Sequence, residues 1–171
     1  IIYLAVSGEE QGLVGSEAWA AAARARGEDI RGVINLDMVG WRRADDPPDL
    51  DLITNRASED LRSFVLAAAA LYLPDFAGVD GACGGGNSDQ QSFWDFGYRA
   101  LTFHEDTDTS NPFYHTDTDR VGPSVNDPAF FRRNVQVALA GLATLARPVR
   151  AHIEHGLCCD FDSCLRFVDG R

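Results

Sequence analysis

Short apolar runs alternate with Ala-rich amphipathic segments along the first part of the chain. Ile1–Val6 is continuous, apolar and rich in β-branched residues, as is typical of a strand buried on both faces. Leu13–Arg26 is Ala-rich and ends at Gly27, which predicts a helix. Ile30–Met38 predicts a second buried strand. Together these segments predict a βαβ unit with parallel strands and a right-handed crossover.

The same alternation continues to residue 146. Short strands are predicted at Leu50–Thr54 and Arg99–Phe103. Three helices are predicted: one capped by Ser58 over Leu61–Leu73, one over Asp89–Phe96 after a capping box that begins at Ser88, and one that opens at Asp127-Pro128 and runs to Ala146. The apolar face of the last helix is expected to hold Phe130, Phe131, Val135, Leu139 and Leu142.

These elements predict one α/β domain of three layers (α/β/α) with a mixed, mainly parallel sheet. We expect residues 1–147 to form a partial catalytic domain and residues 148–171 to be a tail or the start of a further segment. The acidic loop between Glu105 and Val125 is long, and loops of this length in compact domains are usually functional or disordered.

Composition narrows the classes of partner. The 171 residues carry a net charge of -11, which disfavours binding to nucleic acid or anionic lipid. No apolar run is long enough to span a membrane. The first residue is Ile1 and lies inside a predicted core strand, so we expect upstream sequence, and a signal region cannot be read from this chain. Disulfides among Cys83, Cys158, Cys159 and Cys164 cannot be assigned from their spacing.

Carboxylates follow both strands of the predicted βαβ unit. Glu9 and Glu10 come directly after the first strand, and Asp37 stands at the end of the second. Parallel strands end at the same edge of the sheet, where open α/β sheets bind ligands, and the loop with His115 is expected there too. Carboxylates and an imidazole are zinc ligands, although the alternative is a solvated turn whose charges point outward.

Four blocks of sequence, in this order, resemble the bacterial zinc aminopeptidase family related to leucyl aminopeptidase. They are Ser7-Gly8-Glu9-Glu10-Gln11-Gly12-Leu13-Val14-Gly15-Ser16, Asn35-Leu36-Asp37-Met38-Val39-Gly40, Ser88-Asp89 and Asn111-Pro112-Phe113-Tyr114-His115-Thr116. The resemblance implies a metal-dependent exopeptidase that hydrolyses N-terminal residues from peptides, with two zinc ions in a complete domain. It also favours a secreted or periplasmic location.

The resemblance assigns a role to each matched position. Glu9 matches the general base, Glu10 and His115 match ligands of one zinc, and Asp37 matches a ligand of the other. Tyr114 matches a tyrosine that hydrogen-bonds the oxyanion in some members.

This sequence departs from the family pattern in three places. The family has a His-x-Asp motif on an earlier strand, and none precedes Glu9, so this chain alone is expected to be inactive unless upstream sequence supplies it. Gln90 stands where many members have His, and Arg99 where many have Pro. Two alternatives stay open: a glutaminyl cyclase-like acyltransferase on the same fold, and a non-catalytic binding module or inactive fragment.

A structural calcium ion is a weaker hypothesis for the acidic loop. The candidate ligands are Asp106, Asp108, Asp117 and Asp119, but the twelve-residue EF-hand pattern is missing.

Overall fold

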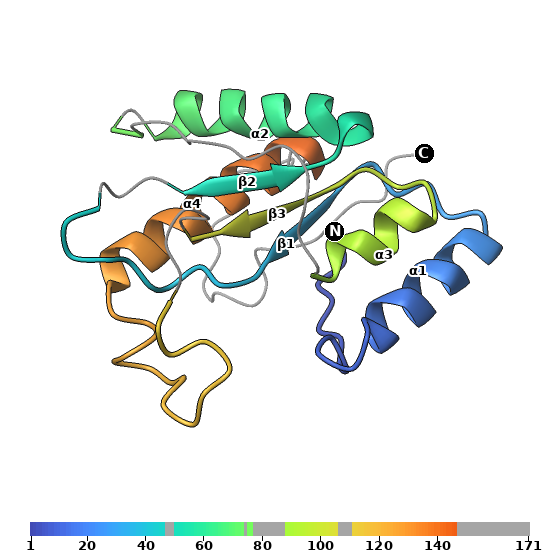
Figure 1. Ribbon diagram of the computed structural model, residues 1–171. Coiled ribbons are helices and arrows are strands. Elements are labelled where there is room, and N and C mark those ends of the chain that lie inside the picture. The colour runs from blue at the N-terminus through green and yellow to red at the C-terminus, as the bar shows by residue number, and fades with distance from the viewer. Residues whose placement is uncertain (47–49, 74, 77–87, 106–110, 147–171) are drawn as a thin grey trace, which may run out of the picture.

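The computed structural model describes residues 1–46, 50–73, 75–76, 88–105 and 111–146. In chain order these residues form α1 (Val14–Ala25), β1 (Val33–Leu36), β2 (Asp51–Thr54), a 3₁₀ turn (Arg56–Ser58), α2 (Glu59–Tyr72), α3 (Gln90–Asp95), β3 (Ala100–His104) and α4 (Pro128–Ala146) (Figure 1). The predicted tail 148–171, all four cysteines, Asp106 and Asp108 lie outside the described residues.

The sheet is mixed, as predicted, with the strand order β1-β3-β2. β3 is central: it pairs in parallel with β1, with Val33 opposite Ala100, and antiparallel with β2, with Asp51 opposite His104. β1 and β3 therefore end at the same edge of the sheet, and the loops that follow them leave from that edge.

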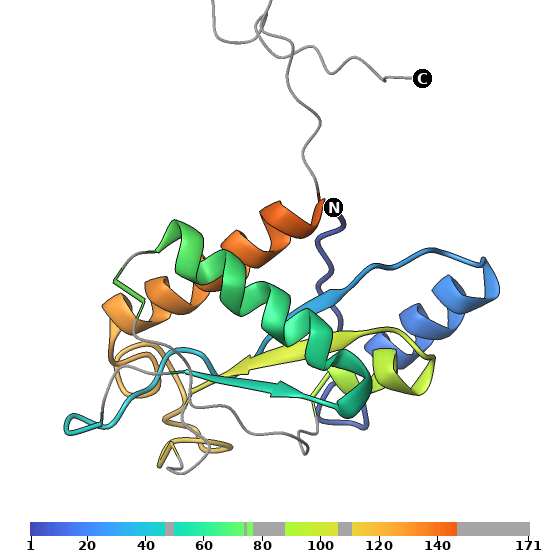
Figure 2. The same ribbon diagram turned by 90° about the horizontal axis from the view of Figure 1, so that it is seen from above.

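Helices cover both faces of the sheet and give the three predicted layers. On one face, α2 and α4 bury an apolar cluster with alternate residues of β3, including Leu101 and Phe103. On the other face, α1 and α3 pack around Phe93, Tyr98 and Ala100. Figures 1 and 2 show α2 and α4 side by side and α1 beside α3, away from them. Leu101 and Phe103 face one cluster and Ala100 the other because successive side chains of a strand point to opposite faces of the sheet.

The predicted first strand is wrong for these residues. Ile1–Val6 forms no strand, and Ile1 and Tyr3 are 70% and 82% exposed. Within the described residues β1 pairs only with β3 and no strand pairs with Ile1–Val6, so the predicted βαβ unit does not form there. The segment nevertheless leads into α1 at the predicted place.

The apolar face predicted for α4 is also partly wrong. Phe130 is buried, but Phe131, Val135 and Leu139 are exposed. The helix packs on α2, and its buried residues include Asn134, Val137, Ala138 and Gly141. A Cβ at Gly141 would come within 2.8 Å of the Val65 side chain, so close approach of the helices, not the width of the apolar stripe, selects the buried face.

Two predicted caps form differently. Ser58 occupies the N-cap position of α2, but its side chain does not cap the helix. The N-cap position of α3 is held by Asp89 and not by the predicted Ser88, and the Asp89 side chain does not cap the helix either. The Ser58 hydroxyl instead accepts a hydrogen bond from the Ala100 N–H. Asp127 behaves as predicted, because its Oδ1 accepts the N–H groups of Ala129 and Phe130 at the start of α4. No helix in the described ranges is long and apolar enough to cross a membrane.

Candidate active site

A compact turn at residues 7–15 carries the two glutamates into α1. The Glu9 carbonyl accepts the N–H groups of Gly12 and Leu13 at 3.0 and 2.8 Å, and Gly15 N–H donates to Ser7 O at 2.9 Å. Gly15 must be glycine here, because a Cβ would stand 2.5 Å from Ser7 O. The turn therefore fixes the backbone on both sides of the Glu9-Glu10 pair.

Asp37 leaves β1 in the direction of this turn. Its N–H donates to Phe103 O at 3.2 Å, which extends the pairing with β3 by one residue. Met38 then has a φ of 51°, a left-handed conformation that a side chain tolerates poorly and that turns the chain away from the sheet. Such strained residues are enriched at functional sites.

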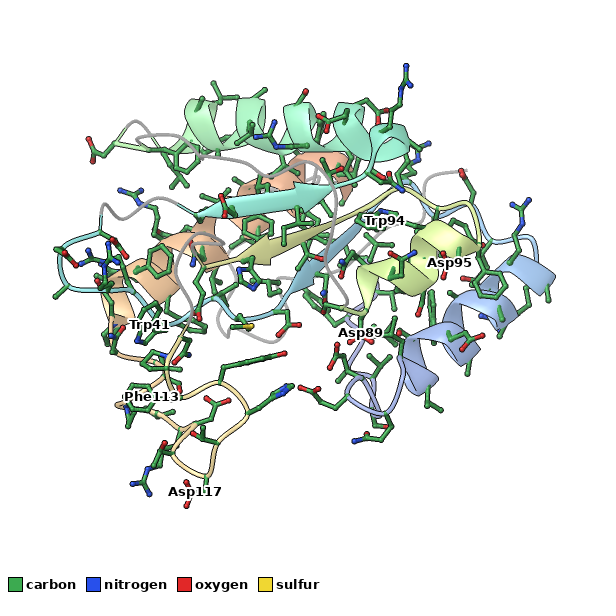
Figure 3. All side chains as sticks on the ribbon, viewed as in Figure 1. Trp41, Asp89, Trp94, Asp95, Phe113 and Asp117 are labelled. Carbon is green, nitrogen blue, oxygen red and sulfur yellow. The ribbon has the colours of Figure 1, made fainter. Side chains whose placement is uncertain are left out.

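Ser88 and Asp89 form the turn that leads into α3. The Asn35 side chain, from β1, donates to the Ser88 hydroxyl at 2.9 Å and also reaches Gln90 Oε1 and Thr102 Oγ1, each at 3.4 Å. This buried polar network ties the turn to the sheet. Asp89 lies at the start of α3, toward the turn that precedes α1 (Figure 3).

The fourth segment is the loop that carries Tyr114 and His115. Tyr114 N–H donates to Asn111 O, and Thr116 N–H to Phe113 O, so two successive turns fold the loop. His115 has a φ of 57°, and its ring stacks on that of Tyr114 with centroids 3.7 Å apart. The stacking holds both side chains together at the site.

Glu10 and His115 come from opposite ends of the sequence and meet at the sheet edge. Their Oε1 and Nε2 atoms are 2.7 Å apart, and the side chains are 57% and 52% exposed. A carboxylate oxygen and an imidazole nitrogen at this separation are suited to sharing either a proton or a cation.

The surroundings of Glu9 differ from those of its neighbour. Its pKa is raised above the ordinary value, first by partial burial and then by the charges of Glu10, Asp37 and Asp89, while His115 acts in the opposite direction. The neighbouring Glu10 and the carboxylates of two other segments, Asp37 and Asp89, therefore act on one carboxyl group. The pKa of Tyr114 is raised too, by partial burial and then by the charges of Glu10, Glu9 and Asp37, so its hydroxyl remains a donor at neutral pH.

This donor set suits a divalent cation in its chemistry. Glu10 and His115 already place an oxygen and a nitrogen side by side, and the carboxylates of Glu10, Asp37 and Asp89 add to the burial that raises the pKa of Glu9. Within the residues that the structure describes, however, no three acidic, histidine or cysteine side chains converge on one point that could hold a metal. Glu10 and His115 alone are too few donors to complete a coordination shell.

Several residues that shape this edge were not predicted to do so. Asn35 lay inside a matched block without an assigned role, Ser88 was predicted only as the start of a capping box, and Glu105 was only the start of a long loop. Ser16 bonds Ser92 at 2.9 Å and Leu13 O at 3.1 Å, which joins α1 to α3. No sequence signal marked Glu105, because an acidic residue at the start of an acidic loop is expected to face water.

The two departures from the family pattern have structural partners. Gln90 is fully buried and lies in the Asn35 network. Arg99 bonds the Asp60 carboxylate and, at 2.8 Å, the Arg31 carbonyl.

The sequence profile of peptidase family M28 matches residues 1–140. The chain belongs to peptidase family M28. This M28 chain is 31% identical over 120 residues to leucine aminopeptidase 1 of Trichophyton rubrum, an alignment that covers 67% of the chain and 32% of that relative. It thus spans about a third of the length of the curated relatives it matches.

Solved structures of similar fold include aminopeptidases. The M28 chain is similar to a zinc aminopeptidase from Bacillus subtilis, with a TM-score of 0.61 and 25% identity over 82% of the chain and 34% of that structure. It is also similar to the Legionella pneumophila LapA aminopeptidase, with a TM-score of 0.63 and 25% identity over 79% of the chain and 36% of that structure.

Proposed function

We propose that the protein to which this chain belongs is a zinc-dependent aminopeptidase that removes N-terminal residues from peptides. The observation that carries the proposal is the meeting of Glu10 and His115 at 2.7 Å beside Glu9, at the edge where β1 and β3 end. Membership of family M28 and the similarity to a zinc aminopeptidase support it.

Each residue has a role in this proposal. Glu10, Asp37 and His115 hold zinc, and the number of ions in the whole protein is two. When bound, zinc supplies a Lewis acid and lowers the pKa of water toward neutrality. Glu9 accepts the proton of the attacking water, the task of a general base. Tyr114 donates its hydroxyl proton to the oxyanion.

The raised pKa of Tyr114 suits the role proposed for its hydroxyl. A tyrosine surrounded by carboxylates keeps its proton, and a protonated hydroxyl is what the oxyanion needs. Glu10 lies in contact with His115 and leaves Glu9 free of that contact, so adjacent residues can serve as ligand and base.

The test is hydrolysis of aminoacyl anilides by the whole protein to which this chain belongs, loaded with zinc, with Glu9→Gln as the variant. We expect Glu9→Gln to lower kcat by about 10²–10⁴-fold while the zinc content stays unchanged, since general-base catalysis contributes that much. Wild-type kcat in the Glu9→Gln variant would contradict the role of Glu9. Cyclisation of an N-terminal glutamine, without anilide hydrolysis, would support an acyltransferase instead.

A further inference from the structure

The turn that carries Glu9 and Glu10 is bonded to the start of α1. Val14 N–H donates to the Gly8 carbonyl at 3.0 Å, and the other backbone bonds of the turn come from the same helix start. In the part of the chain that the structure describes, the segment before the turn is not a strand of the sheet. The turn and α1 therefore form one unit, and the position of Glu9 depends on what fixes α1.

A hydrogen bond between two buried hydroxyl groups joins α1 to α3. Ser16 and Ser92 are 0% and 2% exposed, and their Oγ atoms are 2.9 Å apart. Ser16 also donates to the Leu13 carbonyl at 3.1 Å, which uses its one hydroxyl proton, so Ser92 is the donor in the bond between the helices. The rings of Trp19 and Phe93, with centroids 5.6 Å apart, add an apolar contact between the same two helices.

The side chain of Asn35 joins α3 to β1. Its NH₂ group donates to the Ser88 hydroxyl, which precedes α3, at 2.9 Å and lies 3.4 Å from Gln90 Oε1 in the first turn of that helix. Asn35 stands two residues before Asp37, and positions two apart along a strand share one face of the sheet. The end of β1 therefore carries both a predicted metal ligand and the residue that holds α3.

Helix α3 lies between the sheet and α1, with a polar contact on each side (Figure 1). Apolar packing is not directional, whereas a hydrogen bond tolerates only a narrow range of distance and angle. Satisfied polar networks in the interior make a structure rigid. Because the two polar contacts follow one another between β1 and the turn, the loss of either one removes the directional connection.

We propose that a polar connection through α3 positions the Glu9–Glu10 turn relative to Asp37. This connection, the α3 link, consists of Asn35, Ser92 and Ser16 with the helix between them. The three side chains are positioning residues, because they act on the turn and not on substrate or metal. The tasks of the turn and of Asp37 in catalysis rest on the proposed function, but the connection between them does not.

The first test is hydrogen exchange, followed by mass spectrometry, in the whole protein to which this chain belongs, without metal. We expect Ser92→Ala to speed exchange in peptides that cover residues 12–15 about 2–10-fold, the factor for one hydrogen bond, although Ser92 lies on another helix. Ser58→Ala is the matched control. Ser58 is equally buried, but its hydroxyl bonds the Ala100 N–H at the start of β3, the edge opposite the candidate site. Unchanged exchange of residues 12–15 in Ser92→Ala, or an equal increase in Ser58→Ala, would overturn the α3 link.

A second variant tests whether the two contacts act one after the other. We expect Asn35→Ala to speed exchange of residues 12–15 as Ser92→Ala does, and the double variant to exchange about as fast as either single variant. Effects that multiply in the double variant would show that the contacts act independently, and would overturn the α3 link. If Asn35→Ala does not fold, Ser92→Ala with its control decides the question.

Zinc affinity, measured by competition with a chelator, tests the consequence for the proposed function. The turn carries Glu10, so we expect Ser92→Ala to lower zinc affinity about tenfold, as for other residues that orient metal ligands, and Ser58→Ala to leave it unchanged. Faster exchange in the turn with wild-type zinc affinity would overturn the positioning role. A whole protein that binds no zinc would contradict the proposed function, and the exchange result would still judge the connection.

Discussion

Adjacent glutamates in one turn have different surroundings. Glu10 is exposed and contacts the imidazole of His115, while Glu9 is partly buried and its pKa is raised by that burial and by the charges of Glu10, Asp37 and Asp89. Successive side chains on a bent backbone point in different directions, so one turn gives two carboxylates different surroundings. The separate roles that we propose for Glu9 and Glu10 would thus come from local geometry and electrostatics, since the two side chains are chemically identical.

The contact between Glu10 and His115 leads to a prediction on metal binding. His115→Ala should lower the zinc affinity of the chain at least about tenfold, because it removes one donor and leaves Glu10 without its partner. The measurement is competition with a chelator. Asp117→Asn is the control: Asp117 is exposed in the same loop and points away from the sheet (Figure 3). Equal affinities in wild type and His115→Ala would contradict the prediction.

At the residue scale, the sequence predicted which residues are candidates for the site, but it did not predict most of the contacts between residues. Glu9, Glu10, Asp37 and His115 were singled out from motif blocks, and their roles remain predictions. Glu105 was missed because burial depends on the whole fold, and no local pattern separates a buried acid from a solvated one. Ser58 was assigned to a cap, but its hydroxyl bonds a strand that lies 42 positions further along the chain.

Helix α4 fixes the loop that follows β1 as well as covering the sheet. Asp127 caps the helix with Oδ1 and pairs with Arg42 through Oδ2 at 2.9 Å. The neighbouring Asn126 exchanges two hydrogen bonds with the backbone of Arg42, at 2.9 and 2.8 Å. The residues at the start of α4 therefore cap the helix and also hold the loop that follows β1.

Asp127 gives a pH dependence with a definite sign. Hydrogen bonds from the N–H of Phe130 and from Arg42 lower its pKa in the folded chain, so folding favours the ionised form. The stability it contributes is present above the unfolded pKa of about 3.9 and is lost as the pH falls through the lower folded value. Asp127→Asn keeps a good cap but removes the charge, so the stability of this variant should not show the part of the acid-induced decrease that comes from Asp127.

Urea unfolding of wild type and Asp127→Asn between pH 2 and 7 checks this. We expect wild type to be more stable by about 0.2–1 kcal/mol near pH 6, the range for a partly exposed pair, and the difference to vanish at the acid end. A difference that is the same at both ends of the range would show that the charge of Asp127 contributes nothing to stability.

At the element scale, the hydrophobic periodicity of the sequence predicted the positions of the helices and of β1, β2 and β3. The predicted helix to Ala146 ends where α4 ends, and the predicted strand Leu50–Thr54 differs from β2 by one residue. The failure at Ile1–Val6 has a different cause: a strand needs a neighbour, and apolar character alone does not supply one. The buried face of α4 failed because glycine and alanine carry little hydrophobic signal yet permit close packing.

At the scale of the whole molecule, β3 is the strand on which the layers depend. In the part of the chain that the structure describes, it has hydrogen-bonded neighbours on both sides and apolar clusters on both faces, whereas β1 and β2 have one strand neighbour each. Local opening should therefore begin at β1 or β2 and reach β3 last.

Native-state hydrogen exchange tests this order. We expect the amides of Leu101–Phe103 to exchange most slowly among the strand amides, with rates that approach the limit set by global unfolding. Slower exchange in β1 or β2 than in β3 would contradict it. The mixed sheet and its layers were predicted from sequence, but the order β1-β3-β2 was not, because strand order depends on which edges meet in space.

The contact between Glu10 and His115 also closes a very long loop of chain. The two residues are 105 positions apart, so their contact has a large cost in chain entropy and forms only after the intervening segment has folded. A zinc ion held by both side chains would act as a removable cross-link across that span. For a permanent link of about 100 residues the chain-entropy model gives about 4.7 kcal/mol. Removing the metal would then shorten the lifetime of the folded chain against proteases, as well as stopping the chemistry.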